Sequence, residues 1–275
     1  MFEITSLKLG ELYLPHEGGI MRDPVYCWLV RNGDVAVLVD SGMPDIGVVR
    51  NSLRIDGYGG GHASIVEALA AEGLAPGDIS FVVLTHLHFD HASNLDLFPD
   101  ACVLLQRDEL LHAVDPTPTQ RIYFTKETLA GLIARKRPKH LHLVDGDFRL
   151  MDGLFLLKAP AHTPGFQVPI VTTSAGKAAL VSDLGDHYKY WFPADPRATD
   201  RPKRYLADTF LPGSIRSESE RDWNSAMRRV LDHADIVVPA HDSRIPKRMP
   251  EQWFAIPDST DGDIGREPPH AAAKR

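Results

Sequence analysis

Four short apolar segments of this chain each run directly into histidine or aspartate. Short runs of β-branched residues that end in turn residues predict buried strands. Side chains that follow matching strand ends converge, so the fold has to bring these four ends together. The segments, with the residues that follow them, are 81–84 with His86, His88, Asp90 and His91; 154–159 with His162; 178–181 with Asp183; and 236–238 with His241.

Other apolar runs extend this pattern of strands. The Asn32-Gly33-Asp34 turn separates two of them at hairpin distance, so the chain is expected to open with an antiparallel meander. The further strands are expected over residues 25–30, 35–39 and 102–105.

Helical patterns lie between the strands. Residues 62–72 predict a helix that ends at Gly73, because glycine readily takes the left-handed conformation there. Ser219 and Asp222 have the spacing of a capping box at the start of a second helix. Strands that first form a meander and then alternate with helices favour an α/β domain with sheets inside and helices outside.

Length and composition indicate one folded domain. The 43% hydrophobic and 24% charged content excludes collagen-like and disordered classes. With 275 residues, we expect a single domain over 1–256, carrying insertions over one face at about 107–140 and 188–217. Residues 257–275 are expected to form a loosely ordered tail.

Charge and the first residues argue against two kinds of partner. The 30 basic and 37 acidic side chains give a net charge of −7, so nothing attracts the chain to nucleic acid. The first ten residues lack the basic and apolar regions of a signal peptide, and no run approaches about 18 apolar residues. We therefore expect a cytoplasmic protein that binds neither nucleic acid nor membrane.

Residues 86–91 place four metal-competent side chains directly after a strand, as His-x-His-x-Asp-His. Alternation along an extended segment puts His86 and His88 on the same side, and a turn at Asp90 and His91 presents two more ligands beside them. Imidazole and carboxylate without thiolate suit Zn²⁺, or Mn²⁺ or Fe²⁺. Together with the residues at the other strand ends, the set is large enough for two divalent ions.

These residues resemble the metallo-β-lactamase superfamily in its branch of binuclear hydrolases. The strand that ends in Asp40-Ser41-Gly42 and the loop Ala161-His162-Thr163-Pro164-Gly165 are similar to further motifs of that superfamily. The resemblance implies an αββα sandwich. Asp40 either orients a ligating imidazole or caps a turn. The implied ligands are His86, His88 and His162 for one ion, Asp90, His91 and His241 for the other, and Asp183 between both.

Within that superfamily the chain is similar to N-acyl-homoserine lactonases and related lactone hydrolases. The similarity lies in residues 24–30, 74–79 and 238–242. It implies a small lactone or ester as substrate and, by resemblance to dimeric lactonases, a homodimer. Two positions depart from the lactonase pattern: Asp186 stands where a tyrosine is usual, and Phe166 replaces a second histidine.

A hydrolytic mechanism follows from the resemblance. A hydroxide shared by two divalent ions would attack the lactone carbonyl, because metal binding lowers the pKa of water to about 7. Asp90 is the candidate proton relay, and His187 or Tyr188 is the candidate replacement for the missing tyrosine. A serine or cysteine nucleophile is disfavoured, because the chain has no Gly-x-Ser-x-Gly and its two cysteines, Cys27 and Cys102, lie within apolar runs.

Other functions stay open at this point. A thioester hydrolase resembling glyoxalase II shares the metal motif and would need cationic side chains to bind the carboxylates of glutathione. The candidates for this role are Arg197, Arg201, Lys203 and Arg204. A non-catalytic metal-binding scaffold or sensor is a further alternative, and it would need an incomplete ligand set.

Aromatic residues and the remaining histidines have two interpretations each. Aromatic side chains are more often core than the lining of an acyl pocket, and a lone histidine is usually a surface or hydrogen-bonded core residue. The candidate pocket residues are Tyr26, Trp28, Trp191 and Phe192. The histidines expected to be structural are His16, His62, His112, His140, His142, His233 and His270.

Overall fold

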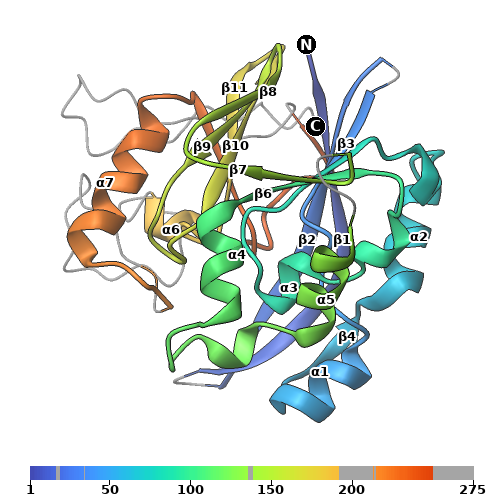
Figure 1. Cartoon of the computed structure of the whole chain (residues 1–275), viewed down its shortest axis with the longest axis vertical. Helices are drawn as coiled ribbons and strands as arrows, with labels where there is room; N and C mark the ends of the chain where they lie inside the picture. Colours follow the sequence, from blue (N-terminus) through green and yellow to red (C-terminus); the bar gives the residue numbers. More distant parts are fainter. Residues whose placement is uncertain (17–18, 34, 136–138, 192–212, 214, 250–275) are drawn as a thin grey trace, which may run out of the picture.

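The chain folds around two β-sheets, and the computed structural model describes residues 1–16, 19–33, 35–135, 139–191, 213 and 215–249 (Figure 1). The larger sheet has the order β13-β1-β2-β3-β5-β6-β7, and β4 also pairs with β1. Its strands are β1 (Glu3–His16), β2 (Gly19–Asn32), β3 (Val35–Val39), β4 (Asp56–Gly59), β5 (Phe81–Val83), β6 (Cys102–Gln106), β7 (Leu141–Val144) and β13 (Arg248–Met249). The smaller sheet has the order β12-β11-β10-β9-β8, with β8 (Phe148–Met151), β9 (Leu154–Lys158), β10 (Gln167–Thr173), β11 (Gly176–Ser182) and β12 (Ile236–Pro239).

The expected opening meander is confirmed. Strands β1, β2 and β3 pair antiparallel in sequence order, and Asn32 stands opposite Val35 across the predicted turn. The sheet then continues with β5, β6 and β7, each parallel to its neighbour. Parallel strands need crossovers, which helices supply here.

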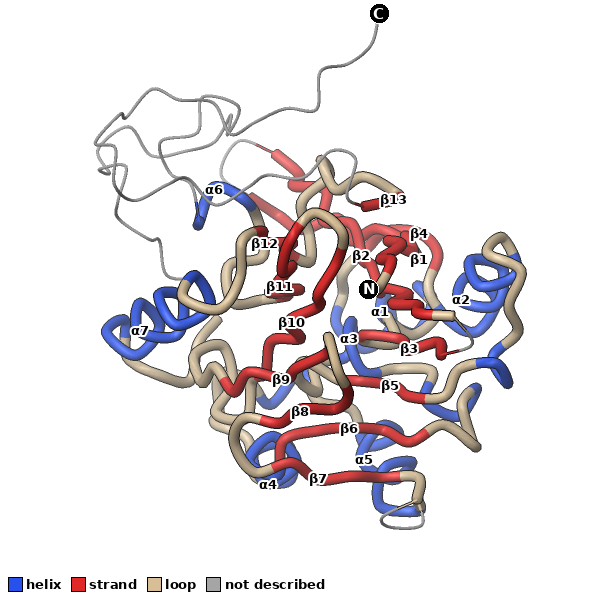
Figure 2. The backbone as a smooth tube through the Cα atoms, turned by 90° about the horizontal axis from the view of Figure 1, so that it is seen from above, coloured by secondary structure: helices blue, strands red, loops and turns tan. Residues whose placement is uncertain are grey.

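Seven α-helices and three short 3₁₀ turns surround the sheets. They are α1 (Ile46–Leu53), α2 (Gly61–Ala70), α3 (Phe89–Ala92), α4 (Arg107–Val114), α5 (Lys126–Ala134), α6 (Tyr188–Trp191), α7 (Glu220–Leu231), η1 (Pro76–Asp78), η2 (Leu95–Leu97) and η3 (Arg121–Tyr123), all within the residues that the structure describes. Figures 1 and 2 place α7 beside the smaller sheet, and α2 and α5 beside the larger one.

The predicted strands lack an alternation of apolar and polar residues because both faces of each sheet are buried, one against the other sheet and one against helices. In β3, Val37 and Val39 pack between the two sheets, whereas Leu38 packs toward the helices of the larger sheet. In β11, Leu180 packs between the sheets, whereas Val181 packs in the cluster that contains α7. The layers are therefore helix, sheet, sheet, helix, and the predicted αββα sandwich is confirmed.

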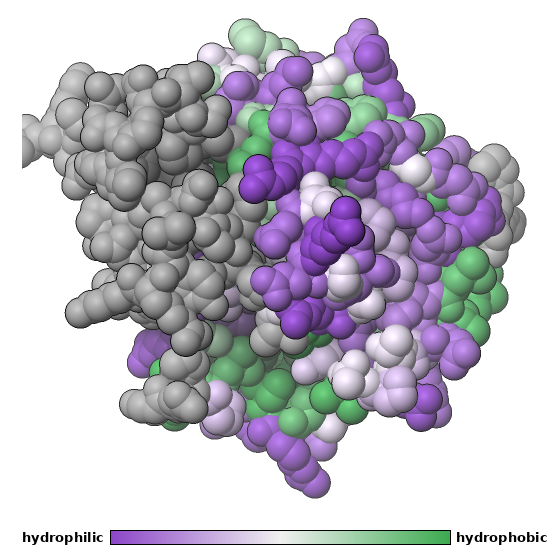
Figure 3. All heavy atoms as spheres, turned by 90° about the vertical axis from the view of Figure 1, so that its left-hand side faces the viewer, coloured by the Kyte–Doolittle hydropathy of each residue, from purple (hydrophilic) through white to green (hydrophobic). Residues whose placement is uncertain are grey.

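Both predicted helices, α2 and α7, are present, but α2 ends earlier than predicted. Ser219 caps α7, and its Oγ accepts the Asp222 N–H at 3.2 Å. The side of the molecule that carries α7 is mostly hydrophilic over its described surface, with apolar side chains in separate patches (Figure 3). Helix α2 ends at Ala70 and not at residue 72, because the N–H groups of Glu72 and Gly73 bond three residues back in a tighter turn.

The stretch 107–140, expected as an insertion over one face, becomes part of the helix layer. It forms α4, η3 and α5, and Leu110, Ala113 and Leu132 of these helices pack into the core beside the larger sheet. Within the described part of the chain, no helix has both the length and the apolar character needed to cross a membrane. Most of the expected insertion at 188–217 and the whole tail lie outside the described residues.

Candidate metal centre

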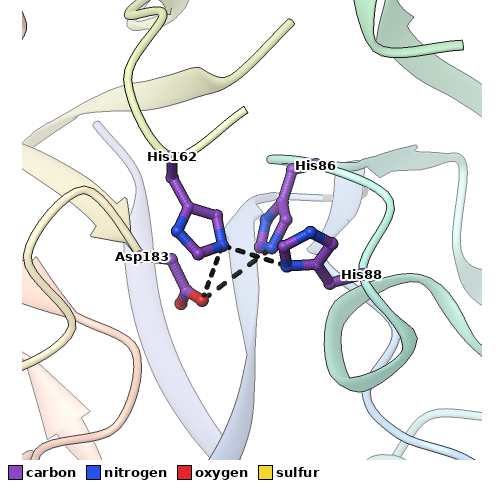
Figure 4. Close-up of side chains that lie close together, drawn as sticks. All are labelled: His86, His88, His162 and Asp183. Carbon is purple, nitrogen blue, oxygen red and sulfur yellow. Dashed lines mark hydrogen bonds and ion pairs between the residues drawn. The ribbon is translucent and has the colours of Figure 1, made fainter. Parts of the chain in front are cut away.

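Three histidines from two sheets converge on one carboxylate, as Figure 4 shows. His86 and His88 follow β5, and His162 follows β9. The Nε2 of His162 lies 3.0 Å from Nδ1 of His88 and 3.3 Å from Oδ2 of Asp183, and Nε2 of His86 lies 3.8 Å from the same oxygen. We call His86, His88 and His162 the three-histidine half.

A second group faces the other oxygen of Asp183. The Nε2 atoms of His91 and His241 lie 3.2 Å and 3.3 Å from Oδ1 of Asp183. Oδ2 of Asp90 lies 3.6 Å from Nε2 of His91 and 3.7 Å from Nε2 of His241. We call Asp90, His91 and His241 the aspartate half.

These separations fit two metal ions. Ligands at 2.0–2.1 Å from a tetrahedral Zn²⁺ lie about 3.3 Å from one another, which is close to the distances between these donor atoms. Nε2 of His86, Nε2 of His91 and Oδ1 of Asp183 are buried and have no hydrogen-bond partner among the described residues. Buried polar atoms are normally paired, so their shared orientation indicates an ion as the partner. The predicted set of seven ligands is brought together, with Asp183 placed between the halves.

Local backbone structure explains why one short segment supplies four ligands. His86 lies three residues after the end of β5, and His88, in an extended conformation, is the N-cap residue of α3. Asp90 and His91 lie in the single turn of α3, so their side chains project beside the first two histidines. The strand end and the helical turn together feed both halves.

The outer ring nitrogens of three ligands are held by fixed acceptors. Nδ1 of His91 donates to Oδ2 of Asp40 at 2.9 Å, and Nδ1 of His162 donates to the Ile215 carbonyl at 2.9 Å. Nδ1 of His241 donates to the Pro24 carbonyl at 2.8 Å. Such bonds fix the tautomer and leave Nε2 free to bind a metal.

Asp40 orients a ligand, which was one of its two expected roles. It is fully buried at the end of β3 in a left-handed conformation, with φ of 59°. Besides His91 it accepts the Thr85 N–H at 2.8 Å and the Thr85 hydroxyl at 2.9 Å. One carboxylate thus fixes both an imidazole and the strand end that carries His86.

The two halves differ in their protonation. Burial holds the pKa values of His86, His88 and His162 below their usual value, so these rings are neutral. Burial opposes a charge on His91 and His241 as well, but nearby carboxylates outweigh it and raise their pKa values well above the usual range. Burial also opposes ionisation of Asp183, yet the surrounding histidines hold its pKa well below normal.

The predicted catalytic residues after Asp183 lie beside the aspartate half. The Asp186 carbonyl accepts the His241 N–H at 2.9 Å. His187 donates from Nδ1 to Asp186 at 3.0 Å, and its Nε2 lies 3.7 Å from Oδ1 of Asp23. The Tyr188 N–H donates to Asp242 at 3.0 Å, while its ring is buried in the core beside α7.

The aromatic residues considered for an acyl pocket are mainly core. Trp28 is fully buried between the sheets, Tyr26 packs in the same cluster, and Trp191 packs in the cluster with α7. The burial of both tryptophans, at 0% and 2% exposure, agrees with the interpretation of these residues as core. Phe192 and the candidate cations Arg197, Arg201, Lys203 and Arg204 lie outside the described residues.

Three residues at the site were not predicted. Glu109 of α4 is buried beside the loops that carry the three-histidine half. Gln120 donates from Nε2 to the His162 carbonyl at 2.6 Å and is bonded to His112 at 2.9 Å, so His112 also supports the site. The Tyr123 ring lies 5.0 Å from the His88 ring. Glu109 lies inside helix α4 and Gln120 in the turn before η3, so neither follows the strand-end pattern that identified the ligands.

Comparison with known proteins agrees with this geometry. An N-acyl homoserine lactonase of Bacillus cereus is 28% identical over 173 residues, which are 60% of this chain and 65% of the relative. The chain thus spans just under two thirds of the length of the lactonases that it matches. Metallo-beta-lactamase domain-containing protein 1 of Rattus norvegicus is 32% identical over 54% of this chain and 55% of its own length.

A solved structure shows the same fold. An N-acyl homoserine lactone hydrolase, with the product N-hexanoyl-L-homoserine bound at its catalytic metal centre, superposes with a TM-score of 0.66. It is 22% identical and covers 88% of this chain and 93% of its own. The family model of the metallo-beta-lactamase superfamily matches residues 20–241, a range that contains all seven ligands. The chain therefore belongs to the metallo-beta-lactamase superfamily, and its seven converging histidine and aspartate side chains form two candidate metal sites.

Proposed function

We propose that this protein hydrolyses lactones, with N-acyl-homoserine lactones as the first class to test. The observation that carries the proposal is the Asp183 carboxylate between two sets of inward-facing donor atoms. The named activity of the Bacillus cereus relative and the product bound in the similar structure support a lactone as substrate.

Two divalent ions held by the seven ligands would supply an acidified water and would polarise an ester carbonyl. Asp90 and Asp183 are the ligands with the most exposed side chains, at 13% and 11%, whereas the ligating histidines expose 5% or less. Substrate therefore approaches from the side of the two carboxylates. To Asp90 we assign the proton that is released when water adds to the carbonyl.

We assign protonation of the leaving alkoxide to His187 in preference to Tyr188. Burial opposes a charge on His187, but the bond to Asp186 and the nearby Asp23 outweigh it and raise its pKa. The His187 side chain is 15% exposed, whereas the Tyr188 ring is packed in the core. A charged imidazole at this edge can give its proton to the alkoxide that ring opening produces.

The site chemistry also bears on the thioester alternative. Asp23 and Asp186, which belong to neither ligand set, both lie beside His187 next to the aspartate half, and the carboxylates of a glutathione thioester would meet repulsion from them. This acidic surrounding favours the uncharged ring of a lactone.

A pH-indicator assay on protein of measured metal content tests the proposal. The panel contains short- and long-chain N-acyl-homoserine lactones, an aromatic lactone, S-lactoylglutathione and nitrocefin. We expect acid release from lactones alone, and its loss together with bound metal in His88→Ala. The matched control is His62→Ala, which alters an exposed histidine paired with Asp96 at 3.0 Å. Turnover of the thioester alone, or none of any substrate with two ions bound, would contradict the proposal.

The role of His187 has its own test. His187→Gln should keep both ions and lower kcat about a hundredfold, because general acid catalysis typically contributes that much or more. The loss should shrink for lactones whose leaving alcohol is more acidic. A loss in Tyr188→Phe and none in His187→Gln would assign the proton to the tyrosine.

A further inference from the structure

The backbone between two ligating histidines is held by a buried carboxyl group that belongs to neither half of the metal centre. Glu109 lies in the first turn of α4 and is fully buried. Its Oε1 accepts the Leu87 N–H at 2.9 Å, and Leu87 is the residue between His86 and His88. The bond therefore fixes the peptide that joins these two ligands.

The same glutamate contacts the loop that carries the third histidine. A Cβ atom on Gly165 would lie 2.0 Å from the backbone nitrogen of Glu109, so only glycine allows α4 to pack this closely on the loop. Burial raises the pKa of Glu109 to about 7, against the opposing effect of the Thr163 hydroxyl and the Leu87 and Gly165 N–H groups. Thr163 directly follows His162, so Glu109 lies between the two ligand loops.

The surroundings of Glu109 distinguish it from an ordinary core residue. Its Oε2 and the Thr163 hydroxyl have no hydrogen-bond partner of normal geometry among the described residues. Burying a carboxyl without a full set of partners is costly, and apolar packing alone would favour an aliphatic side chain at this position. The polar groups that a carboxyl can serve here belong to the two ligand loops, and the Leu87 N–H is the one that it binds with normal geometry.

We propose that Glu109 is a positioning residue for the three-histidine half. By holding the Leu87 amide and seating α4 on the loop after His162, it sets the separation of the imidazoles of His86, His88 and His162. The role concerns the metal centre alone, so it holds whichever substrate the enzyme uses.

Variants that keep only one half allow a direct test. His241→Ala leaves the three-histidine half as the main metal site, and His162→Ala leaves the aspartate half. In each background, Glu109→Ala is compared with its parent by competition titration of Zn²⁺ against a chromogenic chelator. We expect Zn²⁺ binding to weaken about 10- to 100-fold in the His241→Ala background, as for other residues that orient ligands. In the His162→Ala background the change should stay below about threefold.

Two further variants separate the hydrogen bond from charge and from folding. Glu109→Gln keeps an acceptor for the Leu87 N–H, so it should retain most of the Zn²⁺ affinity. Glu109→Asp keeps the charge but shortens the reach, so it should behave like Glu109→Ala. The matched control is Glu127→Ala, an exposed glutamate in the first turn of α5.

Urea unfolding of the apo forms and Co²⁺ spectra complete the experiment. The Co²⁺ absorption of the three-histidine half should change in Glu109→Ala and be restored in Glu109→Gln. Equal weakening of both halves, in proportion to the loss of unfolding free energy, would overturn the proposal and make Glu109 a purely structural residue. Unchanged Zn²⁺ affinity in Glu109→Ala would overturn it as well. So would a Zn²⁺ affinity that is retained in Glu109→Asp but lost in Glu109→Gln, because the charge and not the hydrogen bond would then matter.

Discussion

The two halves of the metal centre share one carboxylate but differ in what lies behind their ligands. In the three-histidine half, the outer ring nitrogens meet uncharged groups: the Thr85 hydroxyl lies 3.1 Å from Nδ1 of His86, and the Ile215 carbonyl accepts from Nδ1 of His162. In the aspartate half, Asp40 bonds His91, and Asp23 lies 3.7 Å from Nδ1 of His241. Negative charge is therefore concentrated on one side of Asp183.

This difference implies a division of labour. Carboxylates behind imidazoles raise the basicity of the ligands and favour a cation. The aspartate half should therefore hold an ion more firmly, whereas His86, His88 and His162, as neutral ligands, would leave more positive charge on a bound ion, which would help it to polarise a carbonyl oxygen. The predictions below test that asymmetry, beginning with the residue the two halves share.

Asp183→Ala should weaken metal binding in both halves, so that neither half holds its ion more firmly than the other. Its two oxygens face different ligand groups, so we expect both ions to be lost and kcat/KM to fall by about 10³-fold or more, since metal ions supply several kcal/mol of transition-state stabilisation. Metal analysis and initial rates on the most active lactone measure this. Retention of one ion at full occupancy would show that Asp183 serves one half only.

The buried carboxyl behind the three-histidine half should make stability depend on pH. The pKa of Glu109 is raised from 4.5 to about 7 by burial, so the folded protein keeps a proton that the unfolded chain releases. The unfolding free energy should therefore fall as pH rises from about 4.5 to 7, by about 3 kcal/mol in the limit. Urea unfolding of apo-protein across this range, compared with Glu109→Gln, checks it. Identical pH slopes in the two proteins would refute it.

Asp40→Asn should weaken the aspartate half selectively. The amide still fills the space but no longer places a charge on Nδ1 of His91, so Zn²⁺ affinity of that half should fall about 10- to 100-fold. Titration in the His162→Ala background reports that half. A larger effect in the His241→Ala background would mean that Asp40 acts mainly through Thr85 on His86.

Stepwise removal of metal should show a small difference in affinity between the two halves. With rising chelator concentration, the ion of the three-histidine half should leave first, at about a tenfold lower concentration than the other, because fewer carboxylates surround it. Co²⁺ spectra of His162→Ala and His241→Ala identify each step. Simultaneous release of both ions would show that shared Asp183 couples them more strongly than their surroundings separate them.

The metal ligands could be predicted from the sequence more fully than the residues that hold the ligand loops in place. The seven ligands share a rule that sequence shows directly, since each follows the end of an apolar strand, and the structure brings all of them together. Glu109 and Gln120 act on backbone amides and carbonyls of distant loops, and such contacts follow no spacing in the sequence. The choice between His187 and Tyr188 also needed packing, because only the fold shows which side chain is buried.

The strands also differ in how well the sequence predicts them. Runs such as β3 and β11 were predictable because both their faces are apolar. Strand β10 was not, because Gln167 and Pro169 interrupt its pattern; Gln167 is nevertheless buried and bonds the Leu84 carbonyl. The long strand β1 was missed because Lys8, Gly10 and Glu11 break its apolar pattern at a bulge.

The ligands come from both sheets, and this has a consequence for the lifetime of the protein. Four ligands follow β5 of the larger sheet, and three follow strands of the smaller one. Bound ions would therefore add cross-links between two sheets that are otherwise held together mainly by side-chain packing, with a few backbone hydrogen bonds such as that from the Phe2 N–H to the Thr172 carbonyl. Because ligands that bind the native state alone stabilise it by mass action, metal starvation would let the layers separate more often and expose the chain to proteolysis. The metal supply of the cell would then govern how long this protein persists, as well as how fast it works.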